Sequence, residues 1–122
     1  MDYKDNAVTI HPYFKVSKEN LALFKRLAQD LVETTRGEMG CLFYGFSYSE
    51  DEAFCRESYK DAESLVSHLD NVKGLLERIE RIADVCRLEV HGPEEEIAKL
   101  KEWLLMKNLS PKYYVIEDGF RN

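Results

Sequence analysis

The sequence predicts an α+β fold of the ferredoxin-like, split βαβ type (βαββαβ), in which two helices cover one face of a four-stranded sheet. Strand-like and helix-like segments follow one another in the order strand, helix, strand, strand, helix, strand over residues 7–91. A short polar tip joins the two middle strands as a hairpin. A further helix and strand follow at 92–122, so we expect one domain over residues 1–122 with a core at about 7–91 and a C-terminal helix-strand extension.

The first half of the core contains one helix between two strands. Residues 7–16, AVTIHPYFKV, alternate as a strand does, and Pro12 predicts either an edge position or a bulge because proline has no N–H for the ladder. The helix that follows runs to about Thr35 and carries its apolar residues at three- and four-residue spacing. The segments 41–49, CLFYGFSYS, and 53–59, AFCRESY, then form the hairpin.

The second half repeats the pattern of helix and strand. Asp61 is a plausible N-cap, and apolar residues continue at helical spacing to Ala83, with Gly74 as a point where the helix breaks or kinks. Residues 83–92 form the fourth strand. In the extension, a proline followed by three glutamates marks a helix start, and YYVIE (113–117) forms a last strand.

The face of the sheet without helices is predicted to be apolar and aromatic. Two alternatives remain for the strand 41–49, because side chains alternate between the faces of a sheet. Either Cys41, Phe43 and Gly45 lie on the bare face, or Leu42, Tyr44, Phe46 and Tyr48 do. A large apolar patch on a sheet indicates a partner, and pairing two such sheets across a two-fold axis buries both. We therefore expect a second copy of the chain to cover this face in a homodimer.

Composition excludes several classes of function. The net charge of −6 and the pI of about 5.1 argue against nucleic-acid binding, which needs a basic surface. No apolar run reaches the roughly 18 residues of a membrane span, and the N-terminus lacks the pattern of a signal peptide. The three cysteines (Cys41, Cys55 and Cys86) fit free, buried thiols in a reducing compartment. We expect a cytoplasmic protein with neither nucleic-acid nor membrane partners.

Two polar residues stand out within apolar segments. His68 lies on the apolar stripe of the second helix, and Glu57 lies in the strand 53–59. An imidazole titrates near neutral pH, so His68 is the candidate general base, with Glu57 as the second catalytic residue. Glu57 and the neighbouring Arg56 point to opposite faces of their strand. The alternative is that both candidates are structural, His68 bonded to main chain or to Glu57, and Glu57 paired with Arg87.

Other candidates for a site are tyrosines and strand histidines. Tyr13, Tyr44 and Tyr59, together with His11, are the predicted substrate-binding residues, because phenol groups combine an apolar ring with a hydrogen-bonding hydroxyl. Filling a dimer interface is the alternative role of the tyrosines. His11, Glu89 and His91 lie on neighbouring strands, but no ligand-spacing motif accompanies them, so we expect no metal site.

The sequence resembles the antibiotic biosynthesis monooxygenase (ABM) family over residues 7–91. The similarity is carried by VTIHPYFKV (8–16), TTRGEMGCLFYGFS (34–47) and above all RESYKDAESLVSHL (56–69). In that family a glutamate two residues before an aromatic closes the third strand, and a histidine follows on the next helix; the corresponding residues here are Glu57, Tyr59 and His68.

The resemblance implies a homodimeric enzyme with the architecture of a dimeric α+β barrel, and with a cavity between sheet and helices in each subunit. It points to a cofactor-independent monooxygenase acting on a small aromatic or enolisable molecule, with His68 as general base and no metal or organic cofactor. Haem-degrading relatives use a histidine further along the helix, and KGLLERIERI (73–82) has none. The alternatives are an isomerase and a non-catalytic ligand-binding or structural dimer of the same fold.

Overall fold

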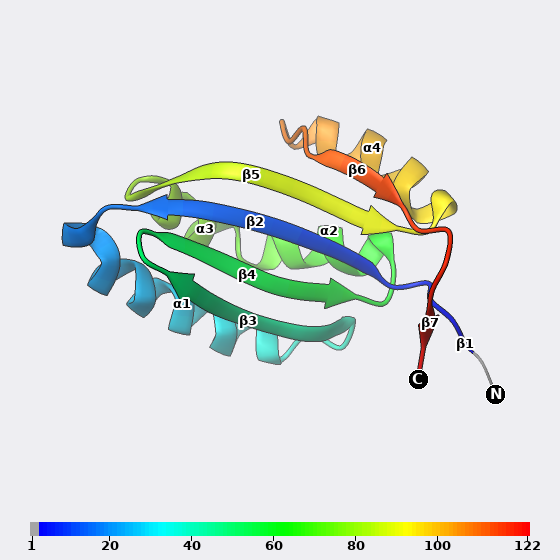
Figure 1. Cartoon of the computed structure of the whole chain (residues 1–122), viewed down its shortest axis with the longest axis horizontal. Helices are drawn as coiled ribbons and strands as arrows, with labels where there is room; N and C mark the ends of the chain where they lie inside the picture. The colour runs from blue at the N-terminus through cyan, green and yellow to red at the C-terminus, as the bar shows by residue number, and fades with distance from the viewer. Residues whose placement is uncertain (1–2) are drawn as a thin grey trace.

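The structure is a computed structural model that describes residues 3–122. Its elements follow the predicted order, with a further short strand at each end (Figure 1). The strands are β1 (Tyr3–Lys4), β2 (Val8–Val16), β3 (Cys41–Ser49), β4 (Glu52–Tyr59), β5 (Ala83–Gly92), β6 (Lys112–Val115) and β7 (Phe120–Arg121). The helices are a 3₁₀ turn (Lys18–Asn20), α1 (Leu21–Arg36), α2 (Ala62–Asn71), α3 (Lys73–Glu80) and α4 (Glu94–Met106).

The main sheet has the strand order β3-β4-β2-β5-β6. The pairs β3·β4, β4·β2 and β2·β5 are antiparallel, whereas β6 is parallel to β5. The first four of these strands have the order of a split βαβ sheet, so the predicted ferredoxin-like class is confirmed. A separate two-stranded ribbon pairs β1 with β7 and brings the two ends of the chain together.

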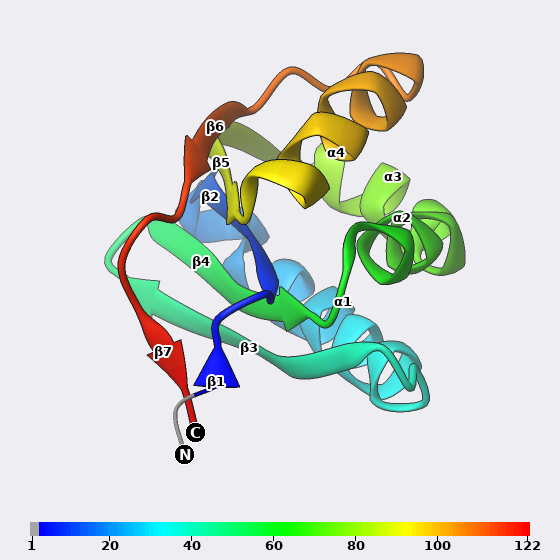
Figure 2. The same ribbon diagram turned by 90° about the vertical axis from the view of Figure 1, so that its right-hand side faces the viewer.

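The helices all lie on one face of the main sheet, and the other face carries none (Figure 2). Two clusters of buried apolar side chains fill the space between the layers. The first joins β2 and α1 through residues such as Phe14, Phe24 and Leu31. The second joins β2, α2 and α4 through residues such as Val8, Leu65 and Leu104. Fully burying side chains of this size stabilises the fold by roughly 1.5–3 kcal/mol each.

The strand β2 is central, with Pro12 near its middle. The register of β2 against β5 shifts between Tyr13 and Phe14, so the predicted irregularity takes the form of a bulge and not of an edge position. Residues before the bulge alternate regularly: Val8 and Ile10 are buried under the helices, and Thr9 and His11 face the other way. The bulge keeps Phe14 in the core although Pro12 interrupts the ladder.

A second strand irregularity, in β3, decides which of its side chains lie on the bare face. Its register against β4 shifts between Cys41 and Phe43, and both Leu42 and Phe43 are exposed, at 43% and 40%. Tyr44 and Phe46 contact the helix-side core, with Phe46 edge-on to Phe24 at a centroid distance of 6.0 Å. The bare face therefore receives Leu42 and Phe43, and the covered face receives Tyr44, Phe46 and Tyr48.

The C-terminal extension is packed into both layers. Ile97, Leu100 and Leu104 on α4 are buried against α2 and β5, and β6 extends the sheet beside β5. The single predicted helix after Asp61 is divided at Val72 into α2 and α3, one residue after the last residue of α2 and two before Gly74. In the part of the chain that the structure describes, no helix is both long and apolar enough to cross a membrane.

Candidate active site

A cavity of about 270 Å³ lies between the sheet and the helices. Its wall is largely aliphatic and aromatic, and its polar groups include the side chains of Glu57, His68 and Tyr44. The exposed residues Glu80 and Val85 also line it, so the cavity reaches the surface between α3 and β5. The apolar wall comes from the strands, from three helices and from the segment after α4: Ile10, Pro12, Phe14, Leu31, Phe46, Leu69, Leu76, Ile79, Leu88 and Leu109.

Glu57 projects into the covered side of the sheet from β4. Strand alternation places it with Cys55 and Tyr59, and Arg56 lies on the other face above the Phe43 ring, 4.4 Å from its centroid. The Glu57 side chain is almost fully buried, and the Tyr59 hydroxyl donates a hydrogen bond to its Oε1 at 2.6 Å. Burial raises the pKa of Glu57 to about 7, against the lowering effect of hydrogen bonds from Tyr59 and Cys55.

His68 is held by the helix α2. The helix begins where the Asp61 carboxylate accepts a hydrogen bond from the Ser64 N–H at 2.8 Å, as predicted for an N-cap. The imidazole, 2% exposed, lies two turns further on. Its Nδ1 lies 2.9 Å from Glu38 Oε2, and its Nε2 lies 3.5 Å from Glu57 Oε1. Burial lowers the pKa of His68, and the Glu38 carboxylate opposes that effect.

These contacts define the working form of the imidazole. A carboxylate only accepts hydrogen bonds, so Nδ1–H donates to Glu38 and Nε2 carries the free electron pair. Because burial lowers the pKa of His68, the neutral ring is the form present at neutral pH. The ring is therefore a base whose accepting nitrogen points toward Glu57 and the cavity.

Glu38 is the member of this group that the sequence did not predict. It lies in the turn between α1 and β3, where its own N–H donates to the Thr35 carbonyl at 2.9 Å. The Asn71 side-chain amide donates to Glu38 Oε2, also at 2.9 Å. The only signal in the sequence was an acidic residue between two glycines in TTRGEMG, which reads equally well as an ordinary polar turn.

Tyr44 and Tyr59 both lie beside the imidazole. Their ring centroids are 5.3 Å and 5.0 Å from that of His68. Tyr44 lines the cavity, and Tyr59 supports Glu57 from within the core. Burial raises the pKa of both phenols, so both stay protonated and serve as hydrogen-bond donors.

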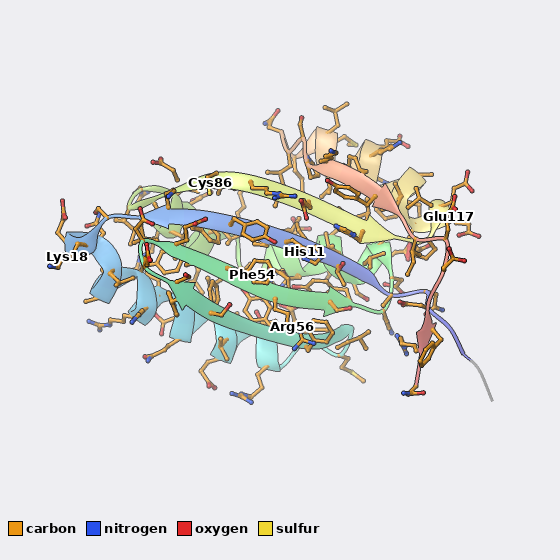
Figure 3. The ribbon with its side chains drawn as sticks, in the orientation of Figure 1. His11, Lys18, Phe54, Arg56, Cys86 and Glu117 are labelled. Atoms are coloured by element: carbon orange, nitrogen blue, oxygen red, sulfur yellow. The ribbon has the colours of Figure 1, made fainter. Side chains whose placement is uncertain are left out.

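His11 and Tyr13 lie on the opposite face of the sheet, away from the cavity. His11 and Phe54 are turned toward the viewer in Figure 3, on the side without helices. His11 Nε2 lies 2.7 Å from Thr9 Oγ1, and Tyr13 stacks on Phe54 at a centroid distance of 4.7 Å. The structure thus brings Glu57, His68, Tyr44 and Tyr59 together and keeps the other two predicted substrate-binding residues apart from them.

The bare face holds a second group of polar residues. The His11 and His91 rings are 4.7 Å apart between centroids, and His91 Nε2 lies 3.4 Å from Glu89 Oε1. Arg87 forms an ion pair with Glu89 and none with Glu57, so the alternative pairing of Glu57 with Arg87 is wrong. Within residues 3–122, no three His, Cys, Asp or Glu side chains are grouped so as to hold a metal ion.

The three cysteines are free, but only one of them is buried. Cys55 lies in the cavity wall, where burial raises the pKa of its thiol well above the ordinary range. Cys41 is half-buried, and Cys86 is exposed on β5, which corrects the expectation that all three are buried. The thiol of Cys55 is therefore a neutral part of the wall and not a nucleophile.

The chain is similar to several solved structures. No protein-family model and no curated protein matches the sequence. The crystal structure of MupZ from Pseudomonas fluorescens superposes with a TM-score of 0.89 and 36% identity, covering 97% of this chain and 96% of that one. A conserved protein from Methanosarcina mazei Go1 has a TM-score of 0.63 and 26% identity over 70% of this chain and 88% of its own.

Structures assigned to the ABM family share the core of the fold. A protein from Caulobacter crescentus CB15 assigned to the antibiotic biosynthesis monooxygenases has a TM-score of 0.65 and 22% identity, over 72% of this chain and 90% of that chain. Together with the near-complete match to MupZ, these neighbours agree with the arrangement of strands and helices described above. The chain belongs to the same family as MupZ and shares its fold with proteins assigned to the antibiotic biosynthesis monooxygenases.

Proposed function

We propose that the protein is a cofactor-independent enzyme that removes a proton from a small apolar molecule, aromatic or enolisable, with His68 as the general base. The observation that carries the proposal is the cavity itself. It combines an apolar wall with an imidazole whose accepting nitrogen is bonded to no main-chain group, and with a carboxyl group whose pKa lies near 7. A volume of about 270 Å³ suits a ligand with few rings.

The proposed reaction begins with proton transfer to His68 Nε2. Glu38 holds the opposite nitrogen and stabilises the imidazolium that forms. In its protonated form, Glu57 is a hydrogen-bond donor beside His68, and the Tyr44 hydroxyl is a second donor at the cavity wall. Both would stabilise negative charge that develops on an enolate or phenolate oxygen in a cavity whose wall is largely apolar.

The carbanion then has two fates. Reaction with dioxygen forms a hydroperoxide at that carbon, and loss of water leaves a carbonyl, so that CH₂ and O₂ give C=O and H₂O. Return of the proton to another carbon gives an isomer. The second fate is favoured by one observation: with a pKa of about 7, Glu57 can give back a proton as readily as it takes one.

We also propose that two copies pair through the bare faces of their sheets. That face carries Leu42, Phe43 and Phe54 beside the half-buried rings of His11 and Tyr13. Apolar and aromatic side chains of this kind are covered in a stable assembly. A two-fold axis would place each cavity on the outside of the paired sheets. The free thiols favour a reducing compartment, and we place the activity in the cytoplasm.

The test separates proton removal from oxygenation. Small phenols, quinols and β-dicarbonyl compounds are incubated with the protein in D₂O without oxygen, and deuterium entry is followed by NMR. The same compounds are then tested for oxygen uptake. We expect deuterium entry with the wild type and a loss on the order of 100-fold or more in His68→Gln. Oxygen uptake by the same compound would identify an oxygenase, and a rearranged product without uptake an isomerase.

His91→Gln is the matched control because it removes an imidazole on the opposite face of the sheet. We expect its rates to stay within about twofold of the wild type. Thermal unfolding of both variants confirms that the fold is kept. Full activity in His68→Gln would refute His68 as the base. Ligand binding with no deuterium entry in any compound would favour the non-catalytic dimer.

A further inference from the structure

Three ionisable side chains stand in a row from the surface to the cavity. Glu38 is 15% exposed at its side chain, His68 is 2% exposed, and Glu57 is 6% exposed. Glu38 also lines a shallow hollow on the surface, beside Met39, Ser64 and Ser67. The row therefore has one end at the solvent and the other at the cavity, with the imidazole between them.

The imidazole faces a carboxyl group at each of its nitrogens. Nδ1 lies 2.9 Å and 3.1 Å from the two Glu38 oxygens, and Nε2 lies 3.5 Å from Glu57 Oε1. A neutral imidazole can accept a proton at one nitrogen and release the other proton from the opposite nitrogen. This property lets a proton pass from one side of the ring to the other while the ring keeps its place.

We propose that Glu38, His68 and Glu57 form a proton relay between the solvent and the cavity, with Glu38 as its outer end and as the residue that positions the imidazole. The inference rests on the proposed function and adds the route by which the site is reset between turnovers. A proton taken up at Nε2 leaves the ring as the Nδ1 proton through Glu38, and the ring is then in the Nε2–H form. A proton that enters through Glu38 to Nδ1 lets Nε2 pass its proton to the ionised Glu57, which restores the Nδ1–H form and reloads Glu57.

The surroundings of the ring suit this role. The ionisable groups that face it are Glu38, Glu57 and the hydroxyls of Tyr44 and Tyr59. The phenols keep their protons, so the two carboxyl groups alone can exchange a proton with the ring. Asn71 lies one helical turn after His68 and donates to Glu38 Oε2 at 2.9 Å, which holds the Glu38 carboxylate beside Nδ1.

The first arm of the test needs no substrate. The ¹⁵N NMR spectrum of the His68 ring in the ligand-free protein reports which nitrogen carries the hydrogen. We expect the Nδ1–H form in the wild type and a change to mainly Nε2–H in Glu38→Ala. Glu38→Gln keeps an acceptor for Nδ1–H but removes a charge that raises the pKa of His68, so that pKa should fall further. An Nε2–H ring in the wild type would overturn the relay.

The second arm measures turnover with a compound that the wild type converts. We expect Glu38→Ala to lower kcat on the order of 100-fold with KM within about twofold, because proton exchange with solvent is lost and binding is not. Added small buffers of near-neutral pKa should restore part of the rate in proportion to their concentration. Glu33→Gln is the control, because Glu33 is an exposed glutamate on α1 that pairs only with Arg36 among the described residues.

The outcomes separate the relay from the function on which it rests. Full activity in His68→Gln would refute the proposed base and the relay together. Loss of activity in His68→Gln with an unchanged rate and unchanged ring tautomer in Glu38→Ala would refute the relay alone. A slow Glu38→Ala variant that no buffer restores would assign Glu38 a purely structural part and overturn the relay.

Discussion

The two faces of the sheet carry the same types of polar residue in opposite circumstances. On the covered face, Glu57 and His68 lie beneath the helices, and burial raises the pKa of Glu57 to about 7. On the bare face, Glu89 forms an ion pair with Arg87 and accepts a hydrogen bond from His91, and these two partners lower the pKa of Glu89 against the opposing effect of burial. Both faces also present tyrosines.

The difference shows that residue type alone does not make an acid-base site. Glu89 has a guanidinium partner that neutralises its charge, so it stays ionised at every physiological pH. Glu57 has a phenol and a weakly basic imidazole as partners, and neither offers a permanent positive charge. The covered face therefore holds a group that gains and loses protons near neutrality, and the bare face holds a fixed network suited to assembly.

The largest expected effect concerns stability as a function of pH. Glu57 has a pKa of about 7 in the folded protein and about 4.5 when unfolded. Because this pKa is raised, the stabilising contribution of Glu57 is fully present below pH 4.5 and is lost as pH rises through 7. The free energy of unfolding should therefore fall by about 3 kcal/mol over this range. In Glu57→Gln this fall should disappear. Urea unfolding of both proteins at about pH 5 and about pH 8 measures the difference.

Glu89→Gln is the matched control on the bare face. The pKa of Glu89 is lowered, so its contribution is present above its unfolded pKa and is lost as pH falls through the folded one. This variant should therefore keep the loss of stability between about pH 5 and pH 8 that the wild type shows. Equal slopes for wild type and Glu57→Gln would contradict the burial of an ionisable Glu57.

A second prediction concerns the proposed pairing of two copies through the bare face. Phe54 stacks on Tyr13 and lies 5.9 Å from the His11 ring between centroids, at the centre of the bare face. Phe54→Ala should raise the dimer dissociation constant on the order of 10- to 100-fold, because aromatic anchors contribute most to interfaces. Sedimentation velocity over a dilution series measures it.

The control for this variant lies on the helix side. Leu105 on α4 is 65% exposed and far from the bare face. The dimer dissociation constant of Leu105→Ala should therefore equal that of the wild type. A wild type that is monomeric throughout the series would refute pairing through the bare face.

A third prediction concerns the support of Glu57. Tyr59→Phe removes the hydrogen bond of 2.6 Å to Glu57 Oε1, and should lower the free energy of unfolding by about 1–2 kcal/mol. That bond lowers the pKa of Glu57, so its loss should raise the pKa above its wild-type value. Tyr13→Phe on the bare face is the comparison variant. A Glu57 pKa that is unchanged in Tyr59→Phe would contradict the contact.

The smallest effect is expected where the C-terminal extension meets the cavity. Leu109 follows α4 and contributes to the wall of the cavity. Leu109→Ala removes apolar contact with a bound molecule and should weaken its binding about three- to fivefold, or about 1 kcal/mol. Leu105→Ala should bind as the wild type does. Unaltered affinity in Leu109→Ala would show that the ligand does not reach the extension.

Local patterns in the sequence were enough to predict the fold and the central pair. Hydrophobic spacing placed His68 on the buried stripe of its helix, and strand alternation placed Glu57 opposite Arg56; both placements are confirmed. Local patterns could not predict the role of Glu38, because its contact with His68 joins a turn to a helix residue 30 positions away. No periodicity in the sequence carries information about such a contact.

A strand irregularity and the choice of covered face explain the other differences between the predicted and the observed arrangement. The bulge at Cys41/Phe43 puts both Leu42 and Phe43 on the bare face, which neither strictly alternating alternative allowed. Strand order placed His11 and His91 on neighbouring strands, but it did not predict the separation of His11 and Tyr13 from His68. That separation follows from which face the helices cover, a property of the whole sheet and not of one strand.

The most direct test of this account is an NMR titration of the side-chain carboxyl carbons of Glu57 and Glu89 in one sample. We expect Glu57 to titrate with a midpoint near 7 and Glu89 with a midpoint below the ordinary value of 4.5. If both carboxyl groups titrated together near 4.5, the covered face would hold no proton-transfer group, and the proposed chemistry would be contradicted.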